Sequence, residues 1–302
     1  MRRFLLLLLL GTVLSSQGQT PRPSTGRVDK IAGFHSKYID ARDIDVWLPS
    51  DYTPDKRYAV LYVHDGQNLF DTSYTYNHEE WKLDETLGNL LKNGTVRETI
   101  VVGIYNSDNR WLEFVPNKPF LSMPPAMKDT MMARMKLKEK TLLSDKYLKF
   151  LVTELKPYID SVYSTYPDVN NTFTMGSSIG GLIAWYAVSE YPKVFGGAAC
   201  LSTHWPGGQM TNGIDNKLYA KMTLKYLQAK APSPINHRLY FDHGTVNLDK
   251  NYEPYQKAVD SLLRKKGYNS SSLLSLNFYG ADHSEKEWAK RLAGPLFFLL
   301  KR

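Results

Sequence analysis

Short apolar runs of strand length recur along the chain, and segments with helical periodicity separate them. The runs Tyr58–Val63 and Ile100–Tyr105 are almost continuously apolar, which is typical of strands buried on both faces of a parallel sheet. Alternation of such strands with helices predicts a doubly wound α/β fold, a mostly parallel central sheet with helices on both faces. The other expected strands are Tyr38–Pro49, Thr172–Met175, Ala198–Leu201, Leu239–Asp242 and Leu273–Tyr279, and the expected helices are Glu80–Leu91, Lys146–Val162, Leu182–Glu190, Leu218–Leu227 and Tyr255–Lys265.

The composition is that of a folded domain with a sizeable core. The chain has 302 residues, of which 42% are apolar and 23% charged. Because no repeat or dividing linker interrupts it, we predict a single domain over residues 19–302, beginning its fold near residue 30 after a polar lead. The formal net charge is +8, from Lys and Arg scattered along the chain. A nucleic-acid binder concentrates such charge in a stripe, so no nucleic-acid partner is predicted. Oligomeric state is not predicted either.

Residues 1–18 have the pattern of a secretory signal peptide. Two arginines precede an apolar run from Phe4 to Leu14, and Ser16 and Gly18 form a small-x-small pattern. The run is shorter than the roughly 20 apolar residues that a membrane-spanning helix needs. We therefore expect no membrane span, cleavage after Gly18, and export to the periplasm or the exterior.

Residues 107–144 depart from the alternation of strands and helices. This segment is rich in Lys and Pro and holds five of the nine methionines, so we interpret it as an insertion. Methionine side chains are flexible and adapt to irregular surfaces. The segment is either a Met-lined flap over an apolar ligand or an amphipathic helix that packs its Met face on the body, and we favour the second.

The motif Gly176-Ser-Ser-Ile-Gly180 lies between an expected strand and an expected helix. In that context Gly-x-Ser-x-Gly predicts a nucleophile elbow, in which the serine occupies a strained turn and the glycines avoid clashes. Ser178 is the candidate nucleophile. The amide of Ile179, at the start of the helix, is a candidate donor to an oxyanion.

A serine nucleophile needs a histidine base and a carboxylate that orients it. His283 follows the last expected strand and precedes Ser284-Glu-Lys-Glu287, a capping box that opens a helix. The carboxylate is expected after an earlier strand, where three candidates occur: Asp242, Asp249 and Glu253. We choose Asp249, because triad acids usually lie on the loop beyond the strand end.

These residues resemble the putative esterase family of α/β-hydrolases, which contains enterochelin esterases, feruloyl and acetylxylan esterases, S-formylglutathione hydrolases and mycolyltransferases. The resemblance covers most of the mature chain. It implies that the amide of Gln67 is the second oxyanion donor and that no metal or cofactor is required. The motifs that carry it are Val63-His-Asp-Gly-Gln-Asn-Leu-Phe-Asp71, Asn106-Ser-Asp-Asn-Arg110, Leu155-Lys-Pro-Tyr158, Met175-Gly-Ser-Ser-Ile-Gly-Gly181, His243-Gly-Thr245, and Gly280-Ala-Asp-His283 followed by Trp288.

The expected function is hydrolysis of a carboxylic ester through an acyl-enzyme. The resemblance implies small-molecule or glycan substrates such as acylated sugars, feruloyl esters or siderophore esters. Two alternatives stay open: an acyltransferase to a sugar or lipid alcohol, and a glycan- or siderophore-binding homologue without catalysis. Trp205 and His204 are candidate substrate-binding residues, since an aromatic platform would stack on a sugar or catechol ring. No metal-binding or dinucleotide motif occurs in the sequence.

Overall fold

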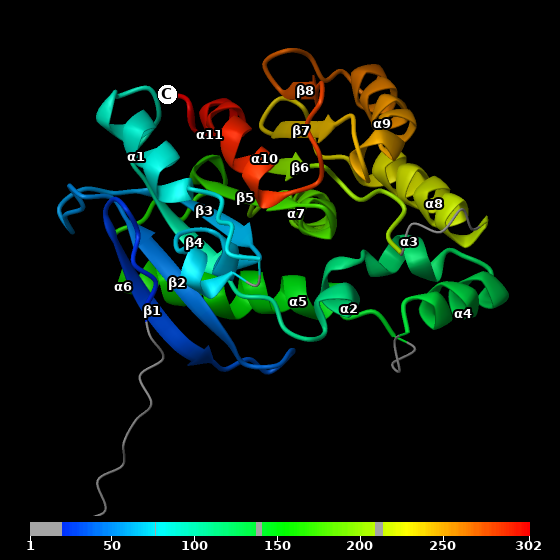
Figure 1. The fold of residues 1–302 in the computed structure, drawn as a ribbon, viewed down its shortest axis with the longest axis horizontal. Coiled ribbons are helices and arrows are strands. Elements are labelled where there is room, and N and C mark those ends of the chain that lie inside the picture. The colour runs from blue at the N-terminus through cyan, green and yellow to red at the C-terminus, as the bar shows by residue number, and fades with distance from the viewer. Residues whose placement is uncertain (1–19, 76, 137–140, 209–213) are drawn as a thin grey trace, which may run out of the picture.

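Eight strands form one sheet that runs through the molecule (Figure 1). The computed structural model describes residues 20–75, 77–136, 141–208 and 214–302, so the expected signal peptide lies outside the described residues. The strands are β1 (Arg27–Phe34), β2 (Arg42–Leu48), β3 (Ala59–His64), β4 (Thr99–Ile104), β5 (Thr172–Ser177), β6 (Gly197–Leu201), β7 (Arg238–Gly244) and β8 (Leu273–Phe278).

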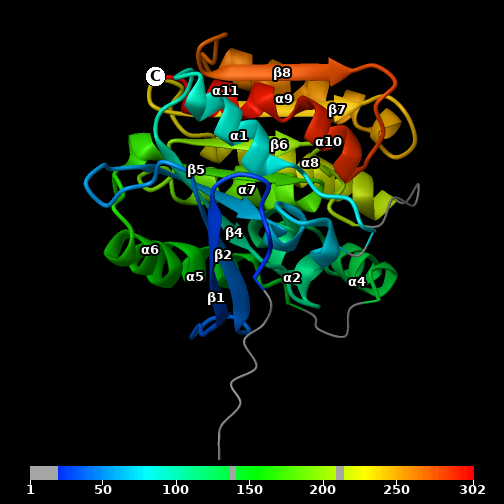
Figure 2. The same cartoon turned by 60° about the vertical axis from the view of Figure 1, so that its left-hand side comes forward.

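The sheet order is β1-β2-β4-β3-β5-β6-β7-β8. The pairs β1–β2 and β2–β4 are antiparallel, and every other pair is parallel. Figure 2 shows β8 at one edge and β1 with β2 at the other, with a strong twist between them, as the right-handed twist of strands requires. The structure therefore confirms the predicted mostly parallel α/β sheet.

Side chains along β3 alternate between two cores, one on each face of the sheet. Ala59, Leu61 and Val63 belong to one buried cluster, whereas Val60 and Tyr62 belong to the other. A strand flanked by two cores has no polar face, because side chains point alternately to opposite sides. This explains why its sequence is continuously apolar.

Helices cover both faces. The cluster on one face includes side chains from α1, α10 and α11, and the cluster on the other face includes side chains from α5 to α9. The helices are α1 (Leu83–Lys92), α2 (Arg110–Phe114), α3 (Asn117–Leu121), α4 (Pro125–Arg134), α5 (Ser144–Phe150), α6 (Lys156–Val162), α7 (Ile179–Glu190), α8 (Ile214–Lys230), α9 (Glu253–Lys265), α10 (Glu285–Arg291) and α11 (Ala293–Leu300), with a π-helical turn η3 (Leu151–Leu155) and 3₁₀ turns η1 (Gly66–Asn68), η2 (Thr72–Tyr74), η4 (Val169–Asn171) and η5 (Asp249–Asn251).

The structure differs from the sequence-based expectation at the N-terminal edge of the sheet. Residues 20–35 were expected to form a polar lead, but Arg27–Phe34 is the edge strand β1. Its side chains are exposed or half-buried throughout, so its sequence lacks the apolar signal of a core strand. Backbone pairing with β2, from Arg27 opposite Leu48 to Phe34 opposite Arg42, forms the strand instead.

The methionine-rich segment forms the short helices α2, α3 and α4 against the body of the protein. Met123, Met131, Met132 and Met135 are buried in the same core cluster as α5 and α7, and Met127 packs against it half-buried. These side chains therefore pack in the interior of the protein.

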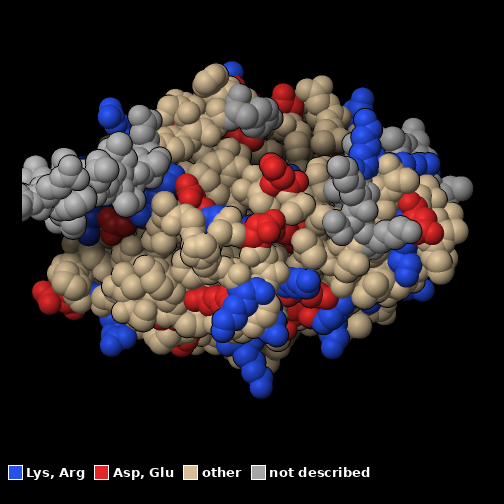
Figure 3. Space-filling model, turned by 90° about the horizontal axis from the view of Figure 1, so that it is seen from below, with Lys and Arg blue, Asp and Glu red and all other residues tan. Residues whose placement is uncertain are grey.

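Charged side chains of both signs are interspersed on the face seen in Figure 3. Among the described helices, none combines the length and apolarity needed to cross a membrane.

Candidate active site

Ser178 occupies the sharp turn between β5 and α7. Its backbone has φ 56° and ψ −124°, a conformation that costs energy for a residue with a side chain. Gly176 makes the turn possible, since a Cβ there would lie 2.4 Å from the backbone carbon and oxygen of Gly180. The Ser178 amide is fixed to the carbonyl of Leu201 at 2.9 Å, and its side chain is half-buried.

Two backbone amides lie near Ser178 at helix starts. Ile179 is the first residue of α7, and Gln67 lies in the short 3₁₀ turn η1. Amides in the first turn of a helix have no acceptor within the helix, so their N–H groups remain available to a ligand. Gln67 lines the same cavity as Ser178.

An ion pair holds the loop that contains Gln67. Asp65 has a left-handed backbone, with φ 60°, and its carboxylate accepts two hydrogen bonds of 2.6 Å from Arg110. Asn106 donates a third bond, also at 2.6 Å. Burial raises the pKa of Asp65, but Arg110 and Asn106 more than offset this, so its pKa is below the ordinary value. Gly66 packs against β4, where a Cβ would meet the carbonyl carbon of Gly103 at 2.4 Å.

His283 contacts a buried carboxylate. Its Nδ1 lies 2.6 Å from Oδ1 of Asp249, which is fully buried, while 16% of the His283 side chain stays exposed. Because a carboxylate only accepts, Nδ1 carries the proton, and Nε2 is left with a lone pair. The ring of Trp288 packs edge-on against His283, with ring centroids 5.0 Å apart.

Two further groups donate hydrogen bonds to the Asp249 carboxylate. Its Oδ2 accepts a bond of 2.7 Å from the Gly244 amide and one of 2.5 Å from the Ser202 hydroxyl. Burial alone would raise the pKa of Asp249, but His283, Ser202 and the Gly244 amide lower it below its ordinary value. Asp249 is therefore an ionised carboxylate at neutral pH.

The other two carboxylate candidates have different partners. Asp242 is buried at the end of β7, where Arg291 donates to it at 3.0 and 3.2 Å and Tyr240 at 2.9 Å. Glu253 lies on the surface at the start of α9 and pairs with Lys257 at 2.8 Å. Asp242 and Glu253 therefore pair with Arg291 and Lys257, whereas Asp249 contacts His283.

Trp205 and His204 are both buried, which differs from the expectation of a stacking platform. Trp205 is 2% exposed, packs against the ring of Trp185 at 5.7 Å, and donates its indole N–H to Gln256 at 3.0 Å. His204 is 3% exposed and faces Tyr252 and the Gly208 carbonyl. Neither ring presents a face to a ligand, because neighbouring helices cover the loop after β6.

The cavity at Ser178 has a volume of about 270 Å³ and a mixed lining. It contains Ser178 and His283, and its remaining wall is mostly polar: Asp65, Gln67, Asn68, Asn106, Arg110, Ser177, Glu285 and Trp288.

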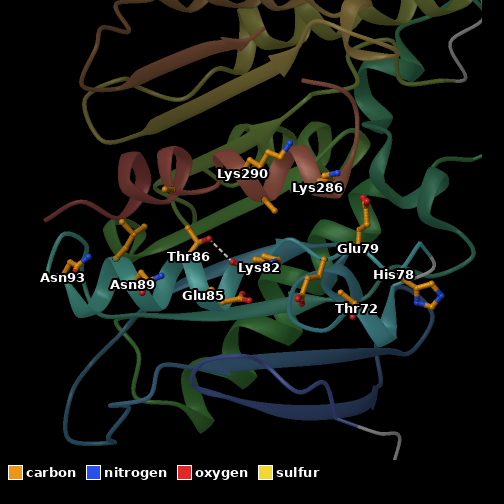
Figure 4. Close-up of a pocket in the computed structure, with 14 residues that line it drawn as sticks. Thr72, His78, Glu79, Lys82, Glu85, Thr86, Asn89, Asn93, Lys286 and Lys290 are labelled. Carbon is orange, nitrogen blue, oxygen red and sulfur yellow. Dashed lines mark hydrogen bonds between the residues drawn. The ribbon is translucent and has the colours of Figure 1, made fainter. Parts of the chain in front are cut away.

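A second cavity of about 760 Å³ lies between α1 and α10. Figure 4 shows its lining, which includes Lys286 and Lys290 from α10 and Thr86 and Asn89 from α1. Neither Ser178 nor His283 lines this cavity. Helix α10 lies between the two cavities, since its residue Glu285 lines the first cavity and its residue Lys286 lines the second.

Across the described ranges, no group of three or more His, Cys, Asp or Glu side chains is arranged to hold a metal ion.

Two residues that support the site, Ser202 and Tyr252, were not predicted from the sequence. Ser202, directly after β6, links Asp249 to Trp288 and Arg291, which contact its hydroxyl at 3.0 and 2.9 Å. Tyr252, three residues after Asp249 in the sequence, packs its ring 5.8 Å from that of His283. Ser202 could have been found from its place at the carboxyl end of β6, the strand next to β5, whereas no local signal indicates Tyr252.

Comparisons with known proteins identify the family to which the chain belongs. The family model for the putative esterase family matches residues 38–299. The chain belongs to this family. The protein is therefore a carboxylic ester hydrolase, and the resemblance to the putative esterase family that was seen in the sequence is confirmed.

Individual relatives are distant. The uncharacterized protein YbbA of Bacillus subtilis is 21% identical over 85% of this chain and 92% of its own length. The ferulic acid esterase AmCE1/Fae1A of Anaeromyces mucronatus aligns with a TM-score of 0.60 and 17% identity, over 92% of this chain and 91% of that one. The enterobactin esterase FES of Shigella flexneri aligns with a TM-score of 0.64 and 16% identity, over 93% of this chain and 60% of that one. At 17% and 16% identity, the likeness to these two solved structures shows a shared fold.

Proposed function

We propose that this esterase is a serine hydrolase whose catalytic triad is Ser178, His283 and Asp249. The observation that most supports the proposal is the contact between His283 and a buried, ionised Asp249 at the rim of the cavity that holds Ser178. The strained backbone of Ser178 adds support, because such strain clusters at functional sites.

The chemistry follows from the roles of these groups. Ser178 Oγ attacks the ester carbonyl carbon while Nε2 of His283 takes the serine proton, and Asp249 stabilises the imidazolium. The amides of Ile179 and Gln67 donate to the oxyanion. His283 then protonates the departing alcohol, and water releases the acid from the acyl-enzyme by the same steps in reverse.

We extend the proposal to esters of acylated sugars, ferulic acid or siderophores. The structural relatives include a ferulic acid esterase and an enterobactin esterase. The cavity wall supports a hydroxyl-bearing substrate, since Asn68, Asn106 and Glu285 lie on it and supply donors and acceptors.

We also propose that the protein is exported and loses residues 1–18, on the basis of the signal-peptide pattern. N-terminal sequencing of the protein recovered outside the cytoplasm tests this. We expect it to begin at Gln19, and recovery of the whole protein in the cytoplasm would contradict the proposal.

Hydrolysis of p-nitrophenyl acetate by the wild type and by Ser178→Ala tests the triad. We expect the variant to lose about 10³-fold or more of kcat/KM, because a triad nucleophile has no substitute. Ser189→Ala, a buried serine at the other end of α7, is the matched control and should retain activity. Equal rates in wild type and Ser178→Ala would contradict the triad. A panel of feruloyl, acetyl-sugar and catecholate siderophore esters then tests the substrate class.

A further inference from the structure

Tyr252 is a buried tyrosine in contact with both reacting side chains. It is 1% exposed and its ring packs edge-on to that of His283 at 5.8 Å. The backbone amide of His204, whose ring contacts the Tyr252 hydroxyl, donates to the Ser178 carbonyl at 3.1 Å and so holds this group beside Ser178. The side chains of Ser178 and Tyr252 interact, which lowers the pKa of Tyr252 against the larger raising effect of burial. No step of the triad mechanism above uses this hydroxyl.

His204 sets the direction of the Tyr252 O–H. The Nδ1 of His204 lies 2.7 Å from the Tyr252 oxygen, and its Nε2 lies 2.6 Å from the carbonyl oxygen of Gly208. A carbonyl only accepts, so Nε2 carries a proton. Burial lowers the pKa of His204 to about 4, and the ring is neutral at neutral pH. Its Nδ1 is therefore an acceptor, and Tyr252 donates its only proton there.

The Tyr252 oxygen consequently turns lone pairs toward Ser178. In the free enzyme this side of the oxygen meets the Ser178 side chain. Once Ser178 is acylated its Oγ carries no proton, and this acceptor position beside His283 becomes available to the second nucleophile.

We propose that Tyr252 is a specificity-determining residue that favours water over alcohols as the acceptor of the acyl group. Water has two O–H bonds, one for Nε2 of His283 and one for the Tyr252 oxygen. An alcohol has a single O–H, which His283 must take, so it leaves the tyrosine oxygen without a donor. The inference rests on the proposed acyl-enzyme and deepens it, because it selects hydrolysis over transfer.

Deacylation of Ser178 follows the same steps with water and with an alcohol. The nucleophile oxygen forms a bond to the acyl carbon, and its proton passes to His283. The bond from that carbon to Ser178 Oγ then breaks, and His283 returns the proton to Oγ. Water gives a carboxylic acid, and an alcohol gives a new ester.

Partitioning of the acetyl-enzyme between water and methanol tests the inference. The full-length protein is incubated with p-nitrophenyl acetate and increasing methanol, and the ratio of methyl acetate to acetate is measured. We expect Tyr252→Phe to raise this ratio about fivefold at each methanol concentration, the factor that one hydrogen bond of typical net strength contributes. The ratio comes from the same active sites, so partial loss of folded protein does not change it.

Three further variants complete the design. Tyr255→Phe, a half-buried tyrosine on α9, should leave the ratio unchanged. His204→Gln keeps an acceptor and a donor and should stay near the wild-type ratio, whereas His204→Phe frees the tyrosine O–H and should raise it. An unchanged ratio in Tyr252→Phe and His204→Phe would overturn the inference and leave the triad standing. Absence of both products in the wild type would instead overturn the proposed function, and the inference with it.

Discussion

Nδ1 of His283 lies 2.6 Å from Oδ1 of Asp249, although 34 residues separate them in the sequence. The two follow the neighbouring strands β8 and β7, which pair in parallel. The carboxyl ends of parallel strands meet at one edge of a sheet, and there the loops bring the imidazole over the buried carboxylate. Ser178 follows β5 at the same edge.

Replacing Asp249 separates the three carboxylate candidates. We expect Asp249→Asn to lower kcat by roughly 10³-fold or more with a small change in KM, because an amide cannot hold the Nδ1–H tautomer or stabilise an imidazolium. Glu253→Gln is the control and should stay within about twofold, since Glu253 is on the surface. Steady-state kinetics on p-nitrophenyl acetate measure both. Comparable losses in the two variants would contradict the assignment of Asp249.

The ion pair between Asp65 and Arg110 is expected to support the oxyanion site. Arg110→Met removes a bidentate partner of 2.6 Å from a buried carboxylate, so the loop that carries the Gln67 amide should shift. We expect kcat to fall roughly 10- to 100-fold, less than the roughly 10²- to 10³-fold loss that follows complete removal of an oxyanion donor. Lys128→Met on α4, a charge remote from the cavity, is the control. Full activity in Arg110→Met would show that Asp65 does not need this partner.

The buried pair of Arg291 and Asp242 is expected to govern stability. Both side chains are at most 3% exposed and lie 3.0 Å apart, so Arg291→Leu leaves a carboxylate without its counter-charge. We expect the free energy of unfolding to fall by about 3–5 kcal/mol. Lys290→Leu, an exposed charge on the same helix, should change it by less than about 1 kcal/mol. Urea denaturation followed by circular dichroism measures both, and a similar small loss in each would refute this role.

Two buried histidines make stability depend on pH. Burial lowers the pKa of His64 to about 3 and that of His204 to about 4, while histidines in the unfolded chain titrate near 6.5. Below pH 6.5 these two histidines bind more protons in the unfolded state, so their contribution to the free energy of unfolding falls as pH falls. We expect a loss of about 2 kcal/mol per histidine between pH 8 and pH 5.

Denaturant titrations at pH 8 and pH 5 measure that loss. His204→Gln removes one of the two buried histidines, so the loss between pH 8 and pH 5 should be smaller than in the wild type by about 2 kcal/mol. A difference as large as that of the wild type would mean that His204 is not the source.

The core of the sheet could be predicted from sequence because its signal is local. Strands such as β3 and β4 are buried on both faces, so every position is apolar and the run is visible without knowledge of its neighbours. The edge strand β1 has no such signal, since its pairing with β2 uses backbone groups that every residue carries.

The residues of the candidate site also differ in whether the local sequence predicts their role. The elbow at Ser178 is readable because Gly176 and the serine lie in one continuous motif, and close approach to Gly180 leaves no space for a Cβ. Trp205 is different, since its sequence neighbours do not indicate whether helices cover it, and packing against Trp185 makes it part of the core.

Contacts between residues far apart in the sequence could not be predicted without the tertiary structure. Asp242 lies near the end of β7, and Asp249 and Glu253 follow that strand. The three differ in surroundings that come from elsewhere in the chain: Arg291 beside Asp242, His283 and Ser202 beside Asp249, and solvent around Glu253. The same holds for Tyr252, whose hydroxyl meets His204 from another loop. Local sequence carries backbone preference and hydrophobic pattern, whereas the partner of a buried polar group depends on which strand ends the sheet order brings side by side.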